Sequence, residues 1–350
     1  MPPPASELHW PAEWAPHAAT WLVWPHNADT WPDRLPRIPA IFAQMVRALL
    51  PGESVEILVR DAAEQAAAEL VLTEHRALGA GVHFHHIVTN DSWIRDHGPV
   101  FVRDASGKPF ALDWEYNAWG GKYSGWAEDA QVARRVAEKL QVEALRPGMV
   151  LEGGSIEGDG CGTILTTESC LLHPNRNPEL DRAAVEQQLR RYLGAEKVLW
   201  LAAGIAGDDT DGHVDDLTRF VARGRVVTVV EDRMEDENYR ALCENRERLE
   251  GMQDAGGQAL EIIDLPMPSP VVCGGLRLPA SYANFYVANG AVLVPTFEDP
   301  QDRRALGILT DLFPGRAVVG IPARDLVLGL GACHCLTQQQ PAGPPSGKAE

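Results

Sequence analysis

A cysteine in a glycine-rich segment near the end of the chain is the first candidate for chemistry. Cys335 lies in Gly329–Pro341, where glycines precede the cysteine and a glutamine run follows that is too polar for an apolar core. A thiol on a glycine-bounded turn can face a cleft while the neighbouring backbone approaches a ligand closely. This pattern alone is a weak indication of a nucleophile. It gains weight because three upstream segments supply a histidine and several carboxylates.

The first two upstream segments each place a carboxylate at a predicted turn. Asn90–Pro99 follows a predicted strand, contains Trp93 and Asp96, and ends in Gly-Pro. Strand ends are where open α/β sheets place ligand-binding groups. In Leu151–Ile156, Glu152 precedes two glycines, which let the backbone pass close to a bound group. Taken alone, either segment is better explained by an ordinary turn.

The third segment, Gly207–Asp216, surrounds His213 with five aspartates. His213 and Asp215 are two positions apart, so an extended segment would point both side chains to the same side. Neighbouring carboxylates favour the charged form of a histidine, which suits an acid that protonates a leaving group. Clustered aspartates also bind hard cations, but this spacing does not match an EF-hand loop. A metal site is therefore the weaker interpretation.

Together the four segments indicate attack on a guanidinium carbon. A thiol with the ordinary pKa of ~8.5 is only about 3% thiolate at pH 7, so a histidine or a bound cation must favour ionisation. Several carboxylates around one thiol are unfavourable for a neutral or anionic substrate. A guanidinium offers planar N–H donors that pair with carboxylates in bidentate fashion. A cysteine protease, in contrast, needs no ring of carboxylates.

The charge balance agrees with a cationic substrate. The 350 residues include 31 Lys+Arg against 49 Asp+Glu, which gives a net charge of −18. Nucleic acids and anionic membranes require basic surfaces, so neither is expected as a partner. An acidic surface raises the local concentration of a small cation, although acidity also serves solubility alone.

The six cysteines predict a reduced protein. They are scattered along the chain and form no Cys-x-x-Cys pair, which argues against a disulfide scaffold, a zinc knuckle and a thioredoxin-type motif. The N-terminus has neither a basic start nor an apolar run, and no segment reaches the ~20 apolar residues that span a bilayer. We therefore expect a cytoplasmic location, where a free thiol survives.

Short apolar runs alternate with amphipathic ones, which predicts the α/β class. No linker marks a boundary, so we expect a single catalytic domain over 1–350, with disordered tails at about 1–8 and 342–350. Strands are predicted at Ala19–Trp24, Ser54–Val59, Val82–Val88, Pro99–Arg103, Met149–Gly154, Thr163–Thr166, Leu217–Val221, Val226–Val230 and Leu260–Asp264, and a hairpin at Ser281–Ala288 and Ala291–Pro295. Helices are predicted at Ile38–Leu50, Ala62–Leu78, Trp126–Leu140, Glu179–Leu193, Arg233–Met252 and Pro300–Phe313.

On these residues the chain resembles the agmatine deiminases, a family of the guanidine-modifying superfamily that also includes peptidylarginine and arginine deiminases. The similarity extends nearly from end to end. Together its segments are highly specific, although none would be so alone. They are Pro11–His17, Thr20–Pro25, Asn90–Pro99, Leu151–Ser155, Pro174–Pro178, Asp209–Asp215, Ser281–Gly290, Phe313–Pro322 and His334–Pro341.

The resemblance implies an α/β propeller, in which five ββαβ-like units surround a central catalytic tunnel in a pseudo-fivefold array, with no metal and no organic cofactor. It implies that Cys335 is the nucleophile and that His213 acts as general acid and then as base. It also implies that Asp96 and Asp215 hold the guanidinium nitrogens. The expected reaction is hydrolysis of agmatine to N-carbamoylputrescine and ammonia through a covalent thiouronium intermediate. A homo-oligomer is compatible with this assignment.

Two further residues take family positions, and three features depart from the usual pattern. Glu152 matches an additional carboxylate of the site, and Trp93 matches a pocket wall. Asp211 replaces a usual asparagine, Gly329–Ala332 replaces three glycines and an asparagine, and Cys333 is an additional thiol. Alignment of the His-Cys-x-Thr-Gln motif assigns the nucleophile to Cys335. The departures lie near the pocket, so they affect the substrate more than the reaction.

Other functions stay open at this point. The substrate could be free or peptidyl arginine, although the carboxylate of free arginine requires a basic partner that none of the segments offers. A non-catalytic binder of polyamine-like cations is a second alternative, which the presence of Cys335 and His213 disfavours. A metallohydrolase built on His83, His85 and His86 is a third, but their run is more simply an edge strand.

Overall fold

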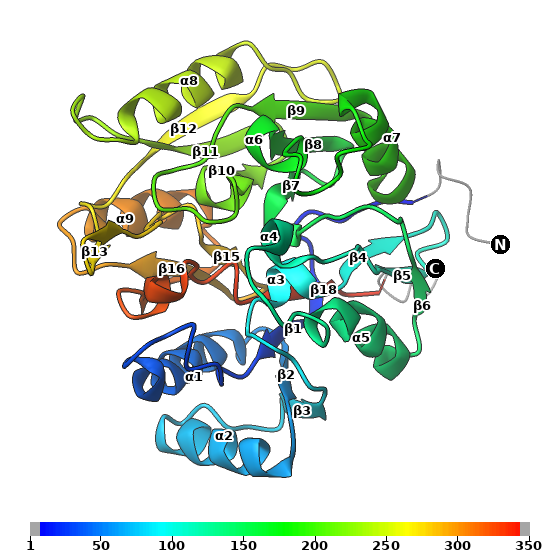
Figure 1. Cartoon of the computed structure of the whole chain (residues 1–350), viewed down its shortest axis with the longest axis vertical. Helices are drawn as coiled ribbons and strands as arrows, with labels where there is room; N and C mark the ends of the chain where they lie inside the picture. Colours follow the sequence, from blue (N-terminus) through cyan, green and yellow to red (C-terminus); the bar gives the residue numbers. More distant parts are fainter. Residues whose placement is uncertain (1–7, 344–350) are drawn as a thin grey trace.

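The computed structural model describes residues 8–343 as several small mixed sheets with helices beside them (Figure 1). Five sheets share one connectivity. In each, a helix connects one strand of an antiparallel pair to a further strand that runs parallel to it, and in one sheet the antiparallel partner comes from the end of the chain. Parallel neighbours need such a crossover, whereas antiparallel ones need only a short turn. The predicted α/β class is confirmed.

Four of these sheets are continuous in the chain. The first contains β4 (Val100–Arg103), β5 (Pro109–Leu112), α5 (Val132–Leu140) and β6 (Glu143–Leu145). The second contains β7 (Ile156–Gly158), β8 (Thr163–Thr167), α6 (Glu168–Leu171), α7 (Arg182–Leu193) and β9 (Lys197–Leu201). The third contains β10 (Thr218–Ala222), β11 (Arg225–Val230), α8 (Tyr239–Glu250) and β12 (Glu261–Pro266). The fourth contains β15 (Tyr286–Val287), β16 (Ala291–Thr296), α9 (Asp302–Leu312) and β17 (Ala317–Pro322), and a short β13–β14 ribbon (Val272–Cys273, Leu276–Arg277) precedes it.

The fifth sheet joins the two ends of the described chain. Its strand order is β18-β1-β2-β3, so the last strand pairs antiparallel with the first. In Figure 1 the five sheets lie around the middle of the molecule, and the long helices lie farther out. Segments distant in sequence therefore meet near the middle. The elements of this sheet are β18 (Gln338–Pro341), β1 (His17–Val23), α1 (Ile38–Leu49), β2 (Ser54–Val59), α2 (Ala62–Glu74) and β3 (Val82–His86).

The core explains why the crossover helices form where they do. In α1 the buried residues recur at helical spacing, which places one apolar face against the sheets. Burial of one large aliphatic or aromatic side chain contributes about 1.5–3 kcal/mol. One cluster of buried residues includes Leu22 of β1, Phe42 of α1, Val227 of β11 and Leu293 of β16, so it unites three of the sheets.

Two predicted strands are wrong where they approach the middle of the molecule. Instead of a strand over Met149–Gly154, Gly153–Ser155 forms a 3₁₀ turn (η4) before β7. A Cβ on Gly153 would lie 2.2 Å from the carbonyl oxygen of Arg95, so this segment packs backbone against backbone and leaves no room for strand side chains. The Asn289-Gly290 hairpin is confirmed, but β15 contains only two of the residues in Ser281–Ala288.

Several predicted helices are longer than the observed ones. The helix predicted to end at Leu78 ends at Glu74, because Arg76 adopts a left-handed φ of 54° and the N–H of Ala77 bonds back to Leu72. The helices predicted to start at Trp126, Glu179 and Arg233 start instead at Val132, Arg182 and Tyr239. In the second case the Asp181 carboxylate caps the first turn by accepting the N–H of Ala184.

Two further predictions concern disordered tails and the absence of membrane-spanning segments. The predicted tails fall mostly on 1–7 and 344–350, which lie outside the described residues. Leu8 is buried, and His9 forms a β-bridge with Arg103. Among residues 8–343, no helix has the length and apolar character needed to cross a membrane.

Candidate active site

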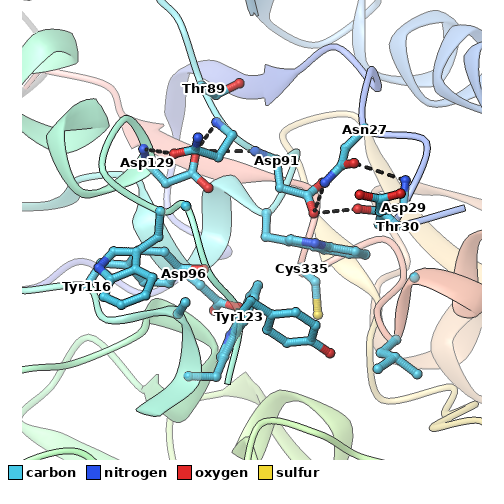
Figure 2. Close-up of a pocket in the computed structure, with 18 of the residues that line it drawn as sticks. Asn27, Asp29, Thr30, Thr89, Asp91, Asp96, Tyr116, Tyr123, Asp129 and Cys335 are labelled. Carbon is cyan, nitrogen blue, oxygen red and sulfur yellow. Dashed lines mark hydrogen bonds between the residues drawn. The ribbon is translucent and has the colours of Figure 1, made fainter. Parts of the chain in front are cut away.

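The candidate site is a cavity of about 620 Å³ that is lined by both Cys335 and Asp96 (Figure 2). Each of these two side chains belongs to a residue that is only 5% exposed. Trp93, which was predicted as a pocket wall, also lines the cavity. Further carboxylates line it as well: Asp29, Asp91, Asp129 and Asp209. The cavity is therefore acidic, and its reactive thiol candidate is shielded from bulk water.

Each of the five sheets contributes to this region the segment that comes before its first strand. Asp96 precedes β4, Glu152 precedes β7, Asp215 precedes β10, Asn284 precedes β15 and Cys335 precedes β18. These segments are turns or short 3₁₀ or α-helical pieces, so each presents one or two side chains at the end of a strand. The predicted site residues come together because the same position is used in every sheet.

Cys335 lies between an amide donor and a carboxylate. Its Sγ accepts a hydrogen bond from Nδ2 of Asn284 at 3.0 Å and lies 3.6 Å from Oδ2 of Asp215. A Cβ on Gly331 would lie 2.5 Å from the Trp93 ring and 3.2 Å from this sulfur, so only glycine permits their packing. Burial and the charge of Asp215 raise the pKa of the Cys335 thiol well above its usual value.

Asp96 and Asp215 are buried and have no lysine or arginine within 4 Å among residues 8–343. Asp96 accepts hydrogen bonds at 3.0 Å from the backbone N–H of Gly154 and from the Trp119 indole. Burial, together with nearby carboxylates such as Asp215, raises the pKa of Asp96. Burial would also raise the pKa of Asp215, but the hydrogen bond to His334 at 2.7 Å outweighs it and lowers that pKa. The other oxygen of Asp215, Oδ1, has no partner.

His213 is fully buried and faces carboxylates on both sides. Nδ1 lies 3.8 Å from Oδ1 of Asp96, and Nε2 lies 3.8 Å from Oε2 of Glu152. Burial would lower the pKa of His213, but the charge of Asp96 and contacts with Cys170 and Glu152 raise it well above its usual value. The raised pKa favours the protonated imidazole, which is the form that an acid for a leaving group requires.

The predicted extended geometry at His213 is wrong, although the residues do converge. Val214–Asp216 form a 3₁₀ turn (η5) rather than an extended segment. A Cβ on Gly154 would lie 2.6 Å from Nδ1 of His213, 2.9 Å from Oδ1 of Asp96 and 3.0 Å from Oδ2 of Asp215. The glycine therefore leaves a small open space at which all three groups meet.

Glu152 lies beside His213 rather than on the cavity wall. Its Oε1 accepts a hydrogen bond at 2.7 Å from Nε of Arg176. The same guanidinium donates to Asp211 at 2.6 Å, and Lys122 approaches Asp211 at 2.8 Å. Asp211 has a left-handed φ of 67°, a conformation that asparagine and aspartate tolerate. The negative charge of Asp211, which stands where the family usually has asparagine, is thus neutralised by Arg176 and Lys122.

Sequence reasoning missed Glu13 and the role of His334 as its partner. Glu13 accepts hydrogen bonds from Arg219 at 2.9 Å, His334 at 2.8 Å and Arg95 at 3.4 Å, and from the backbone N–H of Val287 at 2.8 Å. Burial would raise the pKa of Glu13, but these cations hold it well below its usual range. The only sequence signal was that Glu13 and His334 lie in segments that carry the family resemblance.

The alternative metal sites do not assemble. His85 pairs with Glu56 at 2.5 Å and His86 with Gln65 at 2.7 Å, both on the edge strand β3. Within the described part of the chain, the aspartates of Gly207–Asp216 form no group with metal-ligand spacing. One group does have that spacing, and it consists of Glu152, Cys170 and His213.

The match to known proteins covers nearly the whole chain. Residues 9–341 match the Porphyromonas-type peptidyl-arginine deiminase family, and the chain belongs to this family. Agmatine deiminases of Ectopseudomonas mendocina and Stutzerimonas stutzeri are 39% and 40% identical to it. The first match covers 97% of each chain, and the second covers 95% of each.

Solved structures agree with this assignment. An agmatine deiminase of Enterococcus faecalis matches with a TM-score of 0.90 and 34% identity over 96% of both chains. An agmatine deiminase of C. jejuni, with a cysteine replaced by serine and its substrate bound, matches with a TM-score of 0.86 and 29% identity over 96% of this chain and 97% of that one. The family resemblance predicted from the sequence is confirmed.

Proposed function

We propose that this protein is an agmatine deiminase, which hydrolyses agmatine to N-carbamoylputrescine and ammonia. The observation that carries the proposal is the pair of buried carboxylates, Asp96 and Asp215, beside the Cys335 thiol with no lysine or arginine within 4 Å in the described chain. A guanidinium supplies the missing positive charge and has N–H donors on both edges. Asp96 and the unpartnered Oδ1 of Asp215 accept these donors.

Binding of the cation prepares the nucleophile. The pKa of the Cys335 thiol is raised by burial and by the carboxylates around it. A guanidinium bound between these carboxylates cancels their field, so the pKa of the thiol falls and the thiolate forms. The thiolate then attacks the guanidinium carbon, and the C–S bond forms. Positioning of the reacting groups can supply ~7–11 kcal/mol of the barrier.

His213 carries the protons of both half-reactions. Its imidazolium donates a proton to the departing nitrogen, so the C–N bond breaks, ammonia leaves and a thiouronium remains on Cys335. The neutral imidazole then takes a proton from water, and the hydroxide attacks the same carbon. The C–S bond breaks and the thiol is restored. The net reaction converts a guanidinium and water to a ureido group and ammonium, without a cofactor.

The outer part of the cavity favours a substrate with a second positive charge. Asp91 and Asp129 line the cavity and suit the amino group at the other end of agmatine. Asp209 also lines it but is paired with Lys122 at 3.4 Å. Arg60, which also lines it, is already paired with Glu64 at 2.8 Å. The carboxylate of free arginine would therefore meet mainly negative groups.

A single assay tests the proposal. Purified protein is supplied in parallel with agmatine, free arginine and a peptide with internal arginine, and ammonia is measured. We expect the highest kcat/KM with agmatine and stoichiometric N-carbamoylputrescine. A higher kcat/KM with free arginine or with the peptide would identify that compound, rather than agmatine, as the substrate. If agmatine protects the thiol from a labelling reagent but no ammonia is released, the protein binds the cation without hydrolysing it.

We further propose that the five sheets form a pseudo-fivefold propeller around the cavity. The shared connectivity and the common placement of Asp96, Glu152, Asp215, Asn284 and Cys335 before a first strand support this arrangement. A single catalytic domain and a reducing, cytoplasmic location complete the proposal, and the six free cysteines are consistent with the latter. Sedimentation analysis would decide whether the protein forms a homo-oligomer.

A further inference from the structure

Three side chains with donor atoms for metals meet on the side of His213 that faces away from Asp96. The Cys170 sulfur, a carboxylate oxygen of Glu152 and a ring nitrogen of His213 all lie within 4.8 Å of one another. All three residues are fully buried. Cys170 comes from α6, while Glu152 and His213 precede the turns η4 and η5. Three separate segments therefore hold the group in place.

The polar atoms of this group lack partners. Glu152 uses Oε1 to bind Arg176, but its Oε2 has no hydrogen bond within residues 8–343. Neither ring nitrogen of His213 has one, because the 3.8 Å between Nε2 and Oε2 is too long. Buried polar atoms are almost always hydrogen-bonded in proteins. Oε2 of Glu152 and Nε2 of His213 face each other at 3.8 Å, so one bridging group between them and the Cys170 sulfur would satisfy both.

The donor set is of the zinc type. Zinc binds thiolate sulfur at about 2.3 Å and imidazole nitrogen or carboxylate oxygen at about 2.0 Å in tetrahedral geometry. Neighbouring ligand atoms of such a tetrahedron are then roughly 3.3–3.6 Å apart. The 3.8 Å between Glu152 and His213 therefore needs only a small contraction, and the Cys170 sulfur, which lies within 4.8 Å of both ligand atoms, must move by up to roughly 1.3 Å. Magnesium and calcium prefer oxygen ligands alone, which disfavours them here.

We propose that Cys170, Glu152 and His213 form a binding site for a divalent ion of the zinc class, and that the bound ion reversibly inhibits the enzyme. On binding, the Cys170 thiol and the His213 imidazolium each release a proton, and no oxidation or reduction occurs. The inhibition rests on the proposed function of His213. An ion on Nε2 prevents the imidazole from carrying two protons, so it can no longer act as an acid.

The cavity ends close to this group, on the opposite side of the His213 ring. Asp96 lines the cavity and lies 3.8 Å from Nδ1 of His213. Gly154 leaves the point between them free of a side chain, since a Cβ there would come within 2.9 Å of both groups. The acidic lining of the cavity attracts a divalent cation, as it attracts a cationic substrate.

Cobalt(II) tests the site, because its thiolate complexes absorb through ligand-to-metal charge transfer. The exposed thiols of Cys161 and Cys273 are first replaced by serine, and metal-free protein is titrated with Co²⁺. We expect one equivalent with charge-transfer absorption in this background and also after Cys335→Ala. Addition of Cys170→Ser should remove the absorption and weaken Co²⁺ binding at least ~100-fold, the upper range for changes next to a metal site.

Two outcomes would overturn the site. The first is absorption that survives Cys170→Ser and disappears with Cys335→Ala, because the ion would then sit on the nucleophile. The second is no charge-transfer absorption in any variant. Glu152→Gln is a second test that keeps the thiol. It should retain the absorption with at least about tenfold weaker binding, and unchanged affinity would contradict the ligand set.

Inhibition is measured separately with agmatine and Zn²⁺. We expect loss of ammonia release that a chelator reverses, at concentrations that match Co²⁺ binding. Full turnover with the ion bound at Cys170 would refute the inhibitory role. The spectroscopic titration needs no turnover, so a protein that binds Co²⁺ through Cys170 but never releases ammonia would refute the proposed function and leave the metal site standing.

Discussion

Two groups of buried carboxylates lie on opposite sides of His334, and arginine neutralises only one of them. On one side, Glu13 and Glu157 share Arg219, and Arg95 also reaches Glu13. On the other side, Asp96 lines the cavity and Asp215 lies 3.6 Å from the Cys335 sulfur, and neither has an arginine or lysine within 4 Å in the described chain. His334 connects the groups, because its ring bonds Glu13 at 2.8 Å and Asp215 at 2.7 Å.

This difference separates stability from function. Removal of one partner from a buried ion pair costs about 3–5 kcal/mol, because the other charge is left uncompensated. The Glu13 group therefore holds together segments from both ends of the chain. The Asp96 group is incomplete in the free protein, and a bound guanidinium completes it. The same residue type thus acts as structure on one side of His334 and as substrate recognition on the other.

Separate replacement of the two neighbouring cysteines should give the largest difference in activity. We expect Cys335→Ser to reduce ammonia release from agmatine by at least about 10³-fold, as loss of a nucleophile does in other enzymes. Cys333→Ser should keep activity of the same order, because burial raises the pKa of Cys333 and its thiol does not line the cavity. Loss of activity in Cys333→Ser alone would reassign the nucleophile.

A matched pair of carboxylate-to-amide changes tests the comparison itself. Asp96→Asn should lower kcat/KM by about 10²–10³-fold, as for loss of one group aimed at the reacting centre. It should change the free energy of unfolding by less than about 1 kcal/mol. Glu13→Gln should cost about 3–5 kcal/mol, because Arg219 and His334 lose their partner. Activity assays and urea denaturation of both variants provide the measurements.

The reverse pattern would contradict the division of roles. If Asp96→Asn unfolded the protein while Glu13→Gln left stability unchanged, the Asp96 group would be structural. Asp254→Asn is a suitable control for both variants, since Asp254 is buried, accepts the backbone N–H of Gln258 and does not line the cavity.

Acid should weaken the fold through Glu13. Its pKa in the folded protein is depressed below the usual 4.5, so its contribution to stability is present above that pH and is lost as the pH falls. We expect this group to account for about 1 kcal/mol of the stability lost between pH 6 and pH 4. Urea midpoints at the two pH values should therefore differ less in Glu13→Gln than in the wild type. An identical difference would show that Glu13 does not titrate as described.

The smallest expected effect concerns Asp129. Burial raises the pKa of Asp129 to about 7. Its stabilising contribution is therefore present below its unfolded pKa and is lost as the pH rises toward 7. Ionisation adds a negative charge to the cavity, so KM for agmatine should fall severalfold as the pH rises through 7. Asp129→Asn should flatten this change in KM, and a KM profile identical to the wild type would assign the change to another group.

The sequence predicted the residues of the site better than the segments that hold them. Cys335, Asp96 and Trp93, whose types and family pattern indicated chemistry directly, line the cavity. Glu152 was predicted in a strand, but close backbone packing against Arg95 produces a turn there. Short strands such as β5, β6 and β18 were not predicted at all, since a few residues carry too little pattern to distinguish them from loops.

The compensating network could not be predicted from the sequence. Glu13 and Arg219 are distant in the chain, and only the tertiary fold brings their side chains within 2.9 Å of each other. No local pattern marks either residue as buried. Asn284 was predicted within a strand, but its side chain donates to both Cys335 and Asp216, and this contact is visible only in the fold.

Mapping of the covalent intermediate tests the central claim most directly. The protein is mixed with agmatine, quenched in acid and digested, and the cysteine peptides are weighed by mass spectrometry. We predict an adduct with the mass of agmatine minus ammonia on Cys335, which is absent when Asp96→Asn is treated in the same way. Formation of N-carbamoylputrescine with no adduct on Cys335, or with the adduct on another cysteine, would contradict the account.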